Sequence, residues 1–134
     1  MAGGTGVEYY YGYQTGETDL TAQDHRSRDV KYTHASQALH FFETYLDSYL
    51  VDMVSSDGLT SADDYVLAKP NEVYVVYLPD GGSTNISLPS GTWQVQWFNP
   101  RSGGALTSPQ GVTNSLSAPD TNCLLYTSPS PRDA

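Results

Sequence analysis

Histidines, a cysteine and clustered carboxylates are the side chains in this sequence that could hold a metal or act as a nucleophile. The three histidines, His25, His34 and His40, lie nine and six residues apart, so they do not stack on one face of a helix. No carboxylate or cysteine completes a metal site with them. Asp24 precedes His25, but no Gly-x-Ser-x-Gly motif is present, and the single cysteine, Cys123, lies in a Ser/Pro-rich tail. We therefore expect no metal, no cofactor and no hydrolytic triad.

Three aspartates lie close to a glycine and could be taken for a calcium loop. Asp57, Asp63 and Asp64 follow one another around Gly58. A calcium-binding loop needs carboxylates at alternate positions and a glutamate at its twelfth position, and this segment has neither. We expect these aspartates to serve in turns and caps.

Aromatic side chains offer a second chemistry, stacking on the apolar face of a sugar. Trp93, Val95 and Trp97 alternate along a predicted strand and therefore share one face. Together with Tyr74 and Phe98 they could form an exposed aromatic platform for glycans. The alternative is that this face forms the core of a β-sandwich, and the presence of Val95 among the aromatic rings favours the core.

The charge balance limits the classes of partner. Six Lys and Arg against fifteen Asp and Glu give a net charge of -9, and no basic cluster is present to neutralise a phosphate backbone or an anionic membrane. We therefore expect neither nucleic acid nor membrane as a partner. The residues after Met1 lack a basic n-region and an apolar h-region, so we expect the signal of a secreted parent to lie outside this sequence.

The first half of the chain has helix-like spacing after one short aromatic segment. Residues 6–13 predict a strand that has no partner strand nearby, which suggests that the chain is a truncated part of a larger protein. Residues 18–29 predict a long polar loop. Residues 28–53 predict a helix, because their apolar positions recur every three or four residues.

The predicted helix has a broad apolar stripe, and burial of a large side chain on it should contribute about 2 kcal/mol. The stripe consists of Ala35, Ala38, Leu39, Phe42, Leu46, Tyr49, Leu50 and Met53. Of these, we expect Leu39, Phe42 and Leu46 to contribute most to the core.

The second half of the chain predicts short strands separated by Pro and Gly turns. Strands are expected over residues 65–68, 72–78, 84–88 and 92–98, with one weak strand within 112–117. This spacing is typical of an antiparallel sandwich. The tail, residues 123–134, alternates Ser and Pro and is expected to be disordered; it resembles translated adapter read-through. Within it, only residues 124–126 could serve as a closing strand.

Four blocks of sequence, taken in order, resemble a known family. They are residues 2–14, 19–28, 67–74 and 95–101. Together they are similar to the C-terminal part of bacterial glycoside-hydrolase-like proteins that carry a domain named "putative collagen-binding domain of a collagenase". Those proteins combine a (β/α)8 barrel with a C-terminal β-sandwich.

This resemblance implies a mostly β fold, an antiparallel β-sandwich preceded by a strand-loop-helix remnant of a (β/α)8 barrel. Residues 1–56 would be the last strand and helix of the barrel, and residues 57–122 the sandwich. Residues 123–134 would be a disordered, non-native tail. The catalytic carboxylates of such barrels lie on earlier strands, so the resemblance implies that this chain is not itself an enzyme.

The resemblance also implies where substrate would be bound and what the chain does. Tyr11, Tyr13 and Gln14 would lie near the C-terminal end of the eighth barrel strand and face the substrate, although the tyrosines could equally be barrel core. We expect a non-catalytic accessory or scaffold domain that packs on the missing barrel portion of a secreted, periplasmic or cell-surface parent. The alternative is a collagen- or polysaccharide-binding module. A small self-sufficient enzyme would need Glu8 buried beside Asp19 or Asp24.

Overall fold

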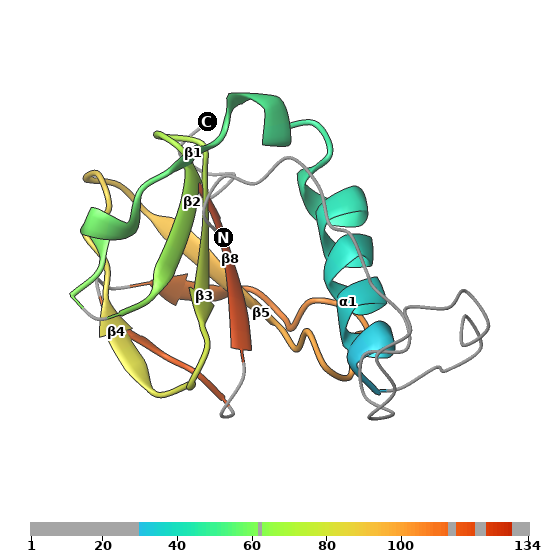
Figure 1. Ribbon diagram of the computed structural model, residues 1–134. Coiled ribbons are helices and arrows are strands. Elements are labelled where there is room, and N and C mark those ends of the chain that lie inside the picture. Colours follow the sequence, from blue (N-terminus) through green and yellow to red (C-terminus); the bar gives the residue numbers. More distant parts are fainter. Residues whose placement is uncertain (1–29, 62, 113–114, 120–122, 130–134) are drawn as a thin grey trace.

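The computed structural model of the chain describes residues 30–61, 63–112, 115–119 and 123–129 (Figure 1). The strand and the loop expected over residues 6–29 lie outside these ranges, as do residues 28 and 29 of the expected helix. The helical elements are α1 (Val30–Phe41), a π-helical turn (Phe42–Leu46) and two 3-10 turns (Leu50–Asp52 and Asp57–Leu59). The strands are β1 (Val54–Ser55), β2 (Tyr65–Lys69), β3 (Val73–Leu78), β4 (Ser83–Asn85), β5 (Trp93–Phe98), β6 (Gln110–Val112), β7 (Ser115–Ser117) and β8 (Cys123–Pro129). Within the described part, no helix is long and apolar enough to cross a membrane.

Two antiparallel sheets form the body of the structure. One sheet has six strands in the order β1-β2-β3-β8-β5-β6, and β4 pairs with β7 in a second, two-stranded sheet. Every pairing between the described strands is antiparallel. The mostly β, antiparallel fold expected from the sequence is therefore confirmed. The single weak strand expected within residues 112–117 is wrong in detail, because β6 and β7 belong to different sheets.

Strand β8 corrects the expectation for the tail. We expected residues 123–134 to be disordered, but Cys123–Pro129 forms a strand in the middle of the six-stranded sheet, between β3 and β5. Its register pairs Leu125 with Val76 on one side and with Trp97 on the other. Pairing on both sides gives this segment more backbone hydrogen bonds than its Ser/Pro composition suggests. Pro129 lies at the last position of the strand, where a missing N–H disturbs the ladder least.

The first hydrophobic cluster lies on the face of the six-stranded sheet that is turned toward β4 and β7. Strand alternation directs Trp93, Val95 and Trp97 of β5 into it, with Gln94 and Gln96 on the opposite face. The buried members of this inter-sheet cluster are Val66, Ala68, Tyr74, Val76, Leu78, Ile86, Trp93, Val95, Trp97 and Leu116. It is the core of a β-sandwich with one broad and one narrow layer.

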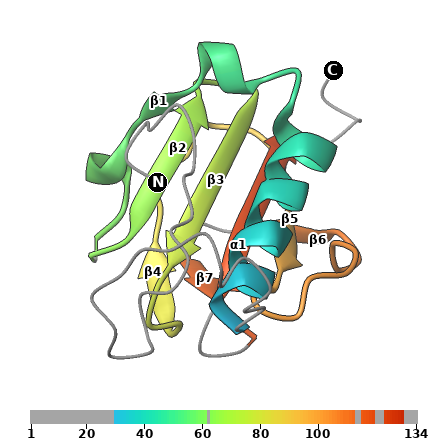
Figure 2. The same ribbon diagram turned by 45° about the vertical axis from the view of Figure 1, so that its right-hand side comes forward.

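The second hydrophobic cluster joins the helical segment to the opposite face of the same sheet. Figure 2 shows α1 lying over that face, alongside β8 and β5. The helix-side cluster contains Phe41, Leu46, Met53, Leu67, Val73, Val75 and Phe98. The ring centroids of Phe41 and Phe98 lie 4.9 Å apart, so the end of α1 packs directly on β5.

The helix stripe predicted from the sequence is partly wrong. Leu46 and Met53 are buried as expected, but Leu39 is 40% exposed, and Phe41, which was not in the stripe, is fully buried. The reason is the π-helical turn that follows α1. Phe41 and Leu46 are five residues apart, the spacing that a π-helical turn places on one face, whereas the prediction assumed an α-helix throughout. Phe42 is half-buried at the margin of the cluster.

Polar contacts hold the helical segment to the sheet. The Lys69 ammonium lies 3.3 Å from the Asp52 carboxylate and 2.9 Å from the Glu72 carboxylate. It also lies 5.7 Å from the centre of the Tyr49 ring. These charges, chiefly the Glu72 hydrogen bond, raise the pKa of Lys69.

The loop between β5 and β6 contacts α1 through a glycine. Gly103 has a φ of 66°, in the left-handed region, and a Cβ at this position would overlap the Gln37 side chain of α1. Glycine is therefore favoured here for its backbone conformation, whereas the overlap is with the far end of the Gln37 side chain, which can move aside. Figure 1 shows this loop, in orange, reaching α1.

Candidate functional site

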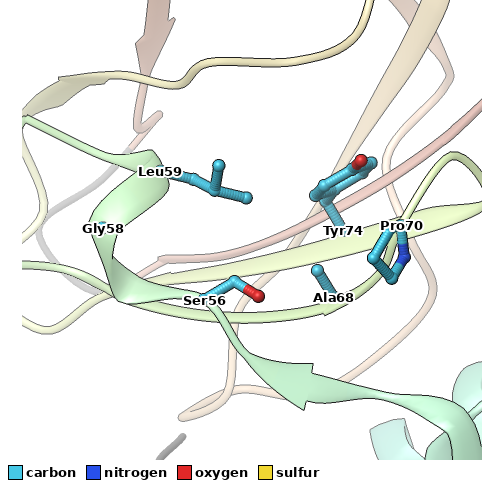
Figure 3. A pocket seen from close by; sticks show the side chains of 6 residues that line it. All are labelled: Ser56, Gly58, Leu59, Ala68, Pro70 and Tyr74. Atoms are coloured by element: carbon cyan, nitrogen blue, oxygen red, sulfur yellow. The ribbon is translucent and has the colours of Figure 1, made fainter.

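A cavity of about 350 Å³ opens at the edge of the inter-sheet cluster (Figure 3). Its lining comes from two elements that are adjacent in space: the segment that follows β1 and the hairpin of β2 and β3. The lining residues are Ser56, Gly58, Leu59, Ala68, Pro70 and Tyr74. We refer to this cavity as the edge pocket.

One wall of the edge pocket is the ring of Tyr74. The Asn71 backbone N–H donates a hydrogen bond of 3.0 Å to the Tyr74 hydroxyl oxygen, and Asn71 has a φ of 66°. The Tyr74 ring packs edge-on against Trp93, with centroids 5.1 Å apart, and Trp93 Nε1 donates to the Pro89 carbonyl at 3.0 Å. These contacts fix the Tyr74 ring, so this wall is preorganised.

The opposite wall is the short turn from Ser56 to Leu59. The Ser56 N–H donates to the Val66 carbonyl at 2.8 Å, and the Val66 N–H donates to Asp57 Oδ1 at 2.6 Å. The Leu59 N–H donates to the Ser56 carbonyl at 2.9 Å. The Asp57 carboxylate thus accepts the hydrogen bond that the backbone carbonyl of a paired strand would otherwise accept, and it holds the turn against β2. Asp57 lies in a turn, as expected from the sequence, but its carboxylate bonds to a strand amide and does not cap the turn.

The chemistry of the edge pocket is that of a binding surface. Its walls are mainly carbon, from Leu59, Ala68, Pro70 and the Tyr74 ring, and Ser56 supplies a hydroxyl. Such a lining suits an apolar side chain or a ring with few polar groups. Among the described residues that line it there is no carboxylate, histidine, lysine or cysteine. Across the described residues, no group of three or more His, Cys, Asp or Glu side chains is arranged to hold a metal ion.

The two tryptophans proposed for an aromatic platform are in the interior. Trp93 is 6% exposed and Trp97 is 7% exposed, and both belong to the inter-sheet cluster. Phe98 is buried on the opposite face of the sheet, against Phe41. These rings therefore form the core, the alternative that Val95 favoured, and an exposed platform at these positions is wrong.

The other residues considered from the sequence are scattered or lie outside the described ranges. Tyr11, Tyr13 and Gln14, the expected substrate contacts, lie outside the described residues, as does His25. His40 is exposed, with a 3.4 Å contact to the Thr44 hydroxyl.

Sequence reasoning did not identify the edge pocket. Ser56 and Leu59 carry no motif, and their closeness to Pro70 arises only because β1 pairs with β2. The turn signal of Lys69-Pro70-Asn71 was recognised, but a turn signal does not show what packs beside it.

Comparison with solved structures defines the class of fold. A structure named "Glycoside hydrolase" matches with a TM-score of 0.67 at 11% identity, over 90% of this chain and 31% of that one. A glycoside hydrolase family 5 structure from Bacteroides vulgatus ATCC 8482 matches with a TM-score of 0.64 at 11% identity, over 90% of this chain and 30% of that one. The chain thus has the fold of a part of these proteins and spans about a third of their length.

The family itself follows from the sequence match. Residues 52–123 match the family described as "Putative collagen-binding domain of a collagenase". Because this match covers more than half of the chain, the chain belongs to that family. The resemblance to glycoside-hydrolase-like proteins that carry this domain is therefore confirmed. No curated protein matches the chain.

Proposed function

We propose that this chain is a non-catalytic accessory part of a glycoside-hydrolase-like protein, in which the sandwich is a scaffold for the catalytic barrel. The helix-side cluster carries this proposal. Phe41 and Leu46 are fully buried against Phe98 and the strands of the broad sheet, so the helical segment and the sandwich share one continuous core. A shared core transmits the position of one element to the other, as a scaffold requires.

The division of the chain into a barrel remnant and a sandwich stays part of this proposal. The sandwich, expected over residues 57–122, is extended to include β1 (Val54–Ser55) and β8 (Cys123–Pro129), which pair in its six-stranded sheet. For the parent protein we propose a secreted, periplasmic or cell-surface location. The low charged fraction, 16%, together with eleven tyrosines supports it, because this balance is common in proteins that meet neutral polymers outside the cell.

Native-state hydrogen exchange tests the scaffold. Phe98→Ala removes the sheet side of the helix-side cluster and should lower amide protection in α1 and in β3 together, by about 3–5 kcal/mol. Leu39→Ala, on the exposed side of the same helix, is the matched control and should lower the protection of both by about 1 kcal/mol or less. If α1 exchanged freely whatever the residue at position 98, helix and sandwich would not be one unit, and the scaffold proposal would fail.

An activity screen tests the non-catalytic role. The purified chain should release no product from a panel of aryl glycosides with gluco, galacto, xylo and manno configuration. Turnover that survives purification to homogeneity would contradict this part of the proposal.

The second candidate function is a binding module for collagen or a polysaccharide. The edge pocket is the observation that favours it, because its apolar lining beside the fixed Tyr74 ring offers a preformed surface. Affinity electrophoresis in gels that contain soluble polysaccharides, together with pull-down on fibrillar collagen, tests this candidate. Retardation that is lost in Leu59→Asp would support it, and the helix-side variants should not change it.

A further inference from the structure

We propose that the edge pocket and strand β1 together bind an extended peptide of alternating apolar and basic residues, which adds to the sheet edge as a further strand. This goes beyond the scaffold role and does not depend on it. Three independent observations lead to it: an edge strand with exposed apolar side chains, a pocket on the adjoining face, and an excess of carboxylates around both.

Strand β1 is the outer strand at one end of the six-stranded sheet, and among the described strands it pairs only with β2. The Ser56 N–H points inward, because it donates to the Val66 carbonyl at 2.8 Å. Backbone groups alternate in direction along a strand, so the N–H and C=O of Ser55 point outward. An outward donor and acceptor at a sheet edge are what an added strand pairs with.

The pocket lies on the face that would receive every second side chain of such a peptide. Val54 is directly opposite Ala68 in the β1–β2 register, so both lie on the face that carries the edge pocket. Val54 is 54% exposed, and Val51, just before β1, is 96% exposed. A peptide residue beside Val54 would lie about two strand spacings, roughly 10 Å, from β2, so its side chain would pack on Val54 at the mouth of the edge pocket, on the side where Ser56 lies (Figure 3).

The carboxylates lie where the alternate side chains of the peptide would point. Ser55 is opposite Leu67, on the face of the sheet that Lys69 shares. Asp52 and Glu72 contact Lys69 there, and their side chains are 61% and 50% exposed. One lysine between two carboxylates leaves a net negative charge at this position. A basic side chain on this face would therefore be attracted.

The charge of the wider segment supports the same choice of partner. Between residues 50 and 80, Lys69 is the single basic residue. The acidic residues in this segment are Asp52, Asp57, Asp63, Asp64, Glu72 and Asp80. A second copy of the chain would bring like charges together at this edge, since each copy carries -9. A basic strand is complementary to the edge, and a copy of the chain is not.

The test is an NMR titration of the ¹⁵N-labelled chain with the peptide acetyl-KVKVKVK-amide. We expect shifts confined to the amides of Ser55, Gly58, Leu59 and Ala68, and weaker binding at higher salt. Acetyl-EVEVEVE-amide tests whether the peptide must carry positive charge. Acetyl-KSKSKSK-amide tests whether its alternate side chains must be apolar. Each should bind at least about tenfold more weakly than acetyl-KVKVKVK-amide.

Two kinds of variant test the location. A Cβ at Gly58 meets nothing within 4 Å, and Gly58 lines the edge pocket. Gly58→Phe should therefore partly fill the pocket and weaken binding at least tenfold. Gly58→Ala, the matched control, should bind as the unaltered chain does. Asp52→Lys, at an exposed position, should weaken the lysine peptide and strengthen the glutamate peptide, which a purely steric effect at Gly58 would not do.

Several results would overturn the proposal. One is that no localised shifts occur at about 1 mM peptide. Another is that the lysine and glutamate peptides bind equally well, and a third is that Gly58→Phe binds the lysine peptide as the unaltered chain does. A fourth is that laminarin or the triple-helical peptide (Pro-Pro-Gly)10 moves these amides while the lysine peptide does not. That result would assign the edge pocket to a glycan or to collagen instead. None of these outcomes bears on the hydrogen-exchange test of the scaffold.

Discussion

Replacing Phe41 with alanine tests the packing of the helical segment most directly. Phe41 is fully buried, and its ring lies 4.9 Å from Phe98, 5.5 Å from Tyr45 and 5.7 Å from Phe42, measured between centroids. Truncating a buried Phe to Ala costs about 3–5 kcal/mol, because apolar contact is lost and a cavity remains. We expect Phe41→Ala to destabilise the chain by this amount.

Leu39→Ala is the control for this prediction. Leu39 belongs to the stripe predicted from an uninterrupted α-helix, so the control compares that predicted face with the face that is buried in the structure. Leu39 is 40% exposed, so its removal leaves no closed cavity, and alanine is the better helix former. We expect a cost of about 1 kcal/mol or less.

Urea unfolding followed by circular dichroism measures both variants. With a slope of about 1–2 kcal/mol per molar urea, Phe41→Ala should lower the midpoint by about 1.5–5 M, and Leu39→Ala by about 1 M or less. If Phe41→Ala does not fold, Phe41→Leu should still cost about 1–3 kcal/mol. Equal costs for Leu39→Ala and Phe41→Ala would refute the π-helical turn as the reason for the buried face.

Three further predictions concern the loop, the ion pairs and the tryptophans. Gly103→Ala and Gly104→Ala should each destabilise the chain by about 1 kcal/mol or more, since both have positive φ. Unchanged midpoints in urea unfolding would show that the backbone conformation of this loop is not required. Lys69→Met should flatten the loss of stability above about pH 10, because a pKa raised by Glu72 gives stability that is present below the ordinary lysine value and lost as pH rises through the folded value. An unchanged alkaline slope in unfolding titrations would contradict this. The fluorescence of Trp93 and Trp97 should have its maximum at short wavelength and resist quenching by iodide, because both side chains are buried. Strong quenching would contradict their burial and favour the exposed aromatic platform.

The edge pocket could not have been derived from the residues that line it. Ser56 and Leu59 lie more than ten residues before Tyr74 in the sequence, and each has an ordinary local role in a turn or strand. Their approach depends on the pairing of β1 with β2 and on the side chain of Asp57, which bonds to the Val66 N–H. The pocket is therefore a property of the strand pairing.

The sequence alone determined the features that depend on local period and on motif order. Alternation along residues 93–98 gave one apolar face, since a pleated strand points successive side chains to opposite sides. Four ordered blocks identified the family, and the family match over residues 52–123 confirmed it.

Tertiary structure decided what local pattern leaves open. The segment Cys123–Pro129 is a central strand because β3 and β5 both offer it backbone partners, which outweighs its Ser/Pro composition. Phe41 rather than Leu39 is buried because a π-helical turn changes the spacing of the face that meets the sheet. The strands that pair with β8, and the Phe98 ring on which Phe41 packs, lie far away in the sequence, where periodicity carries no information.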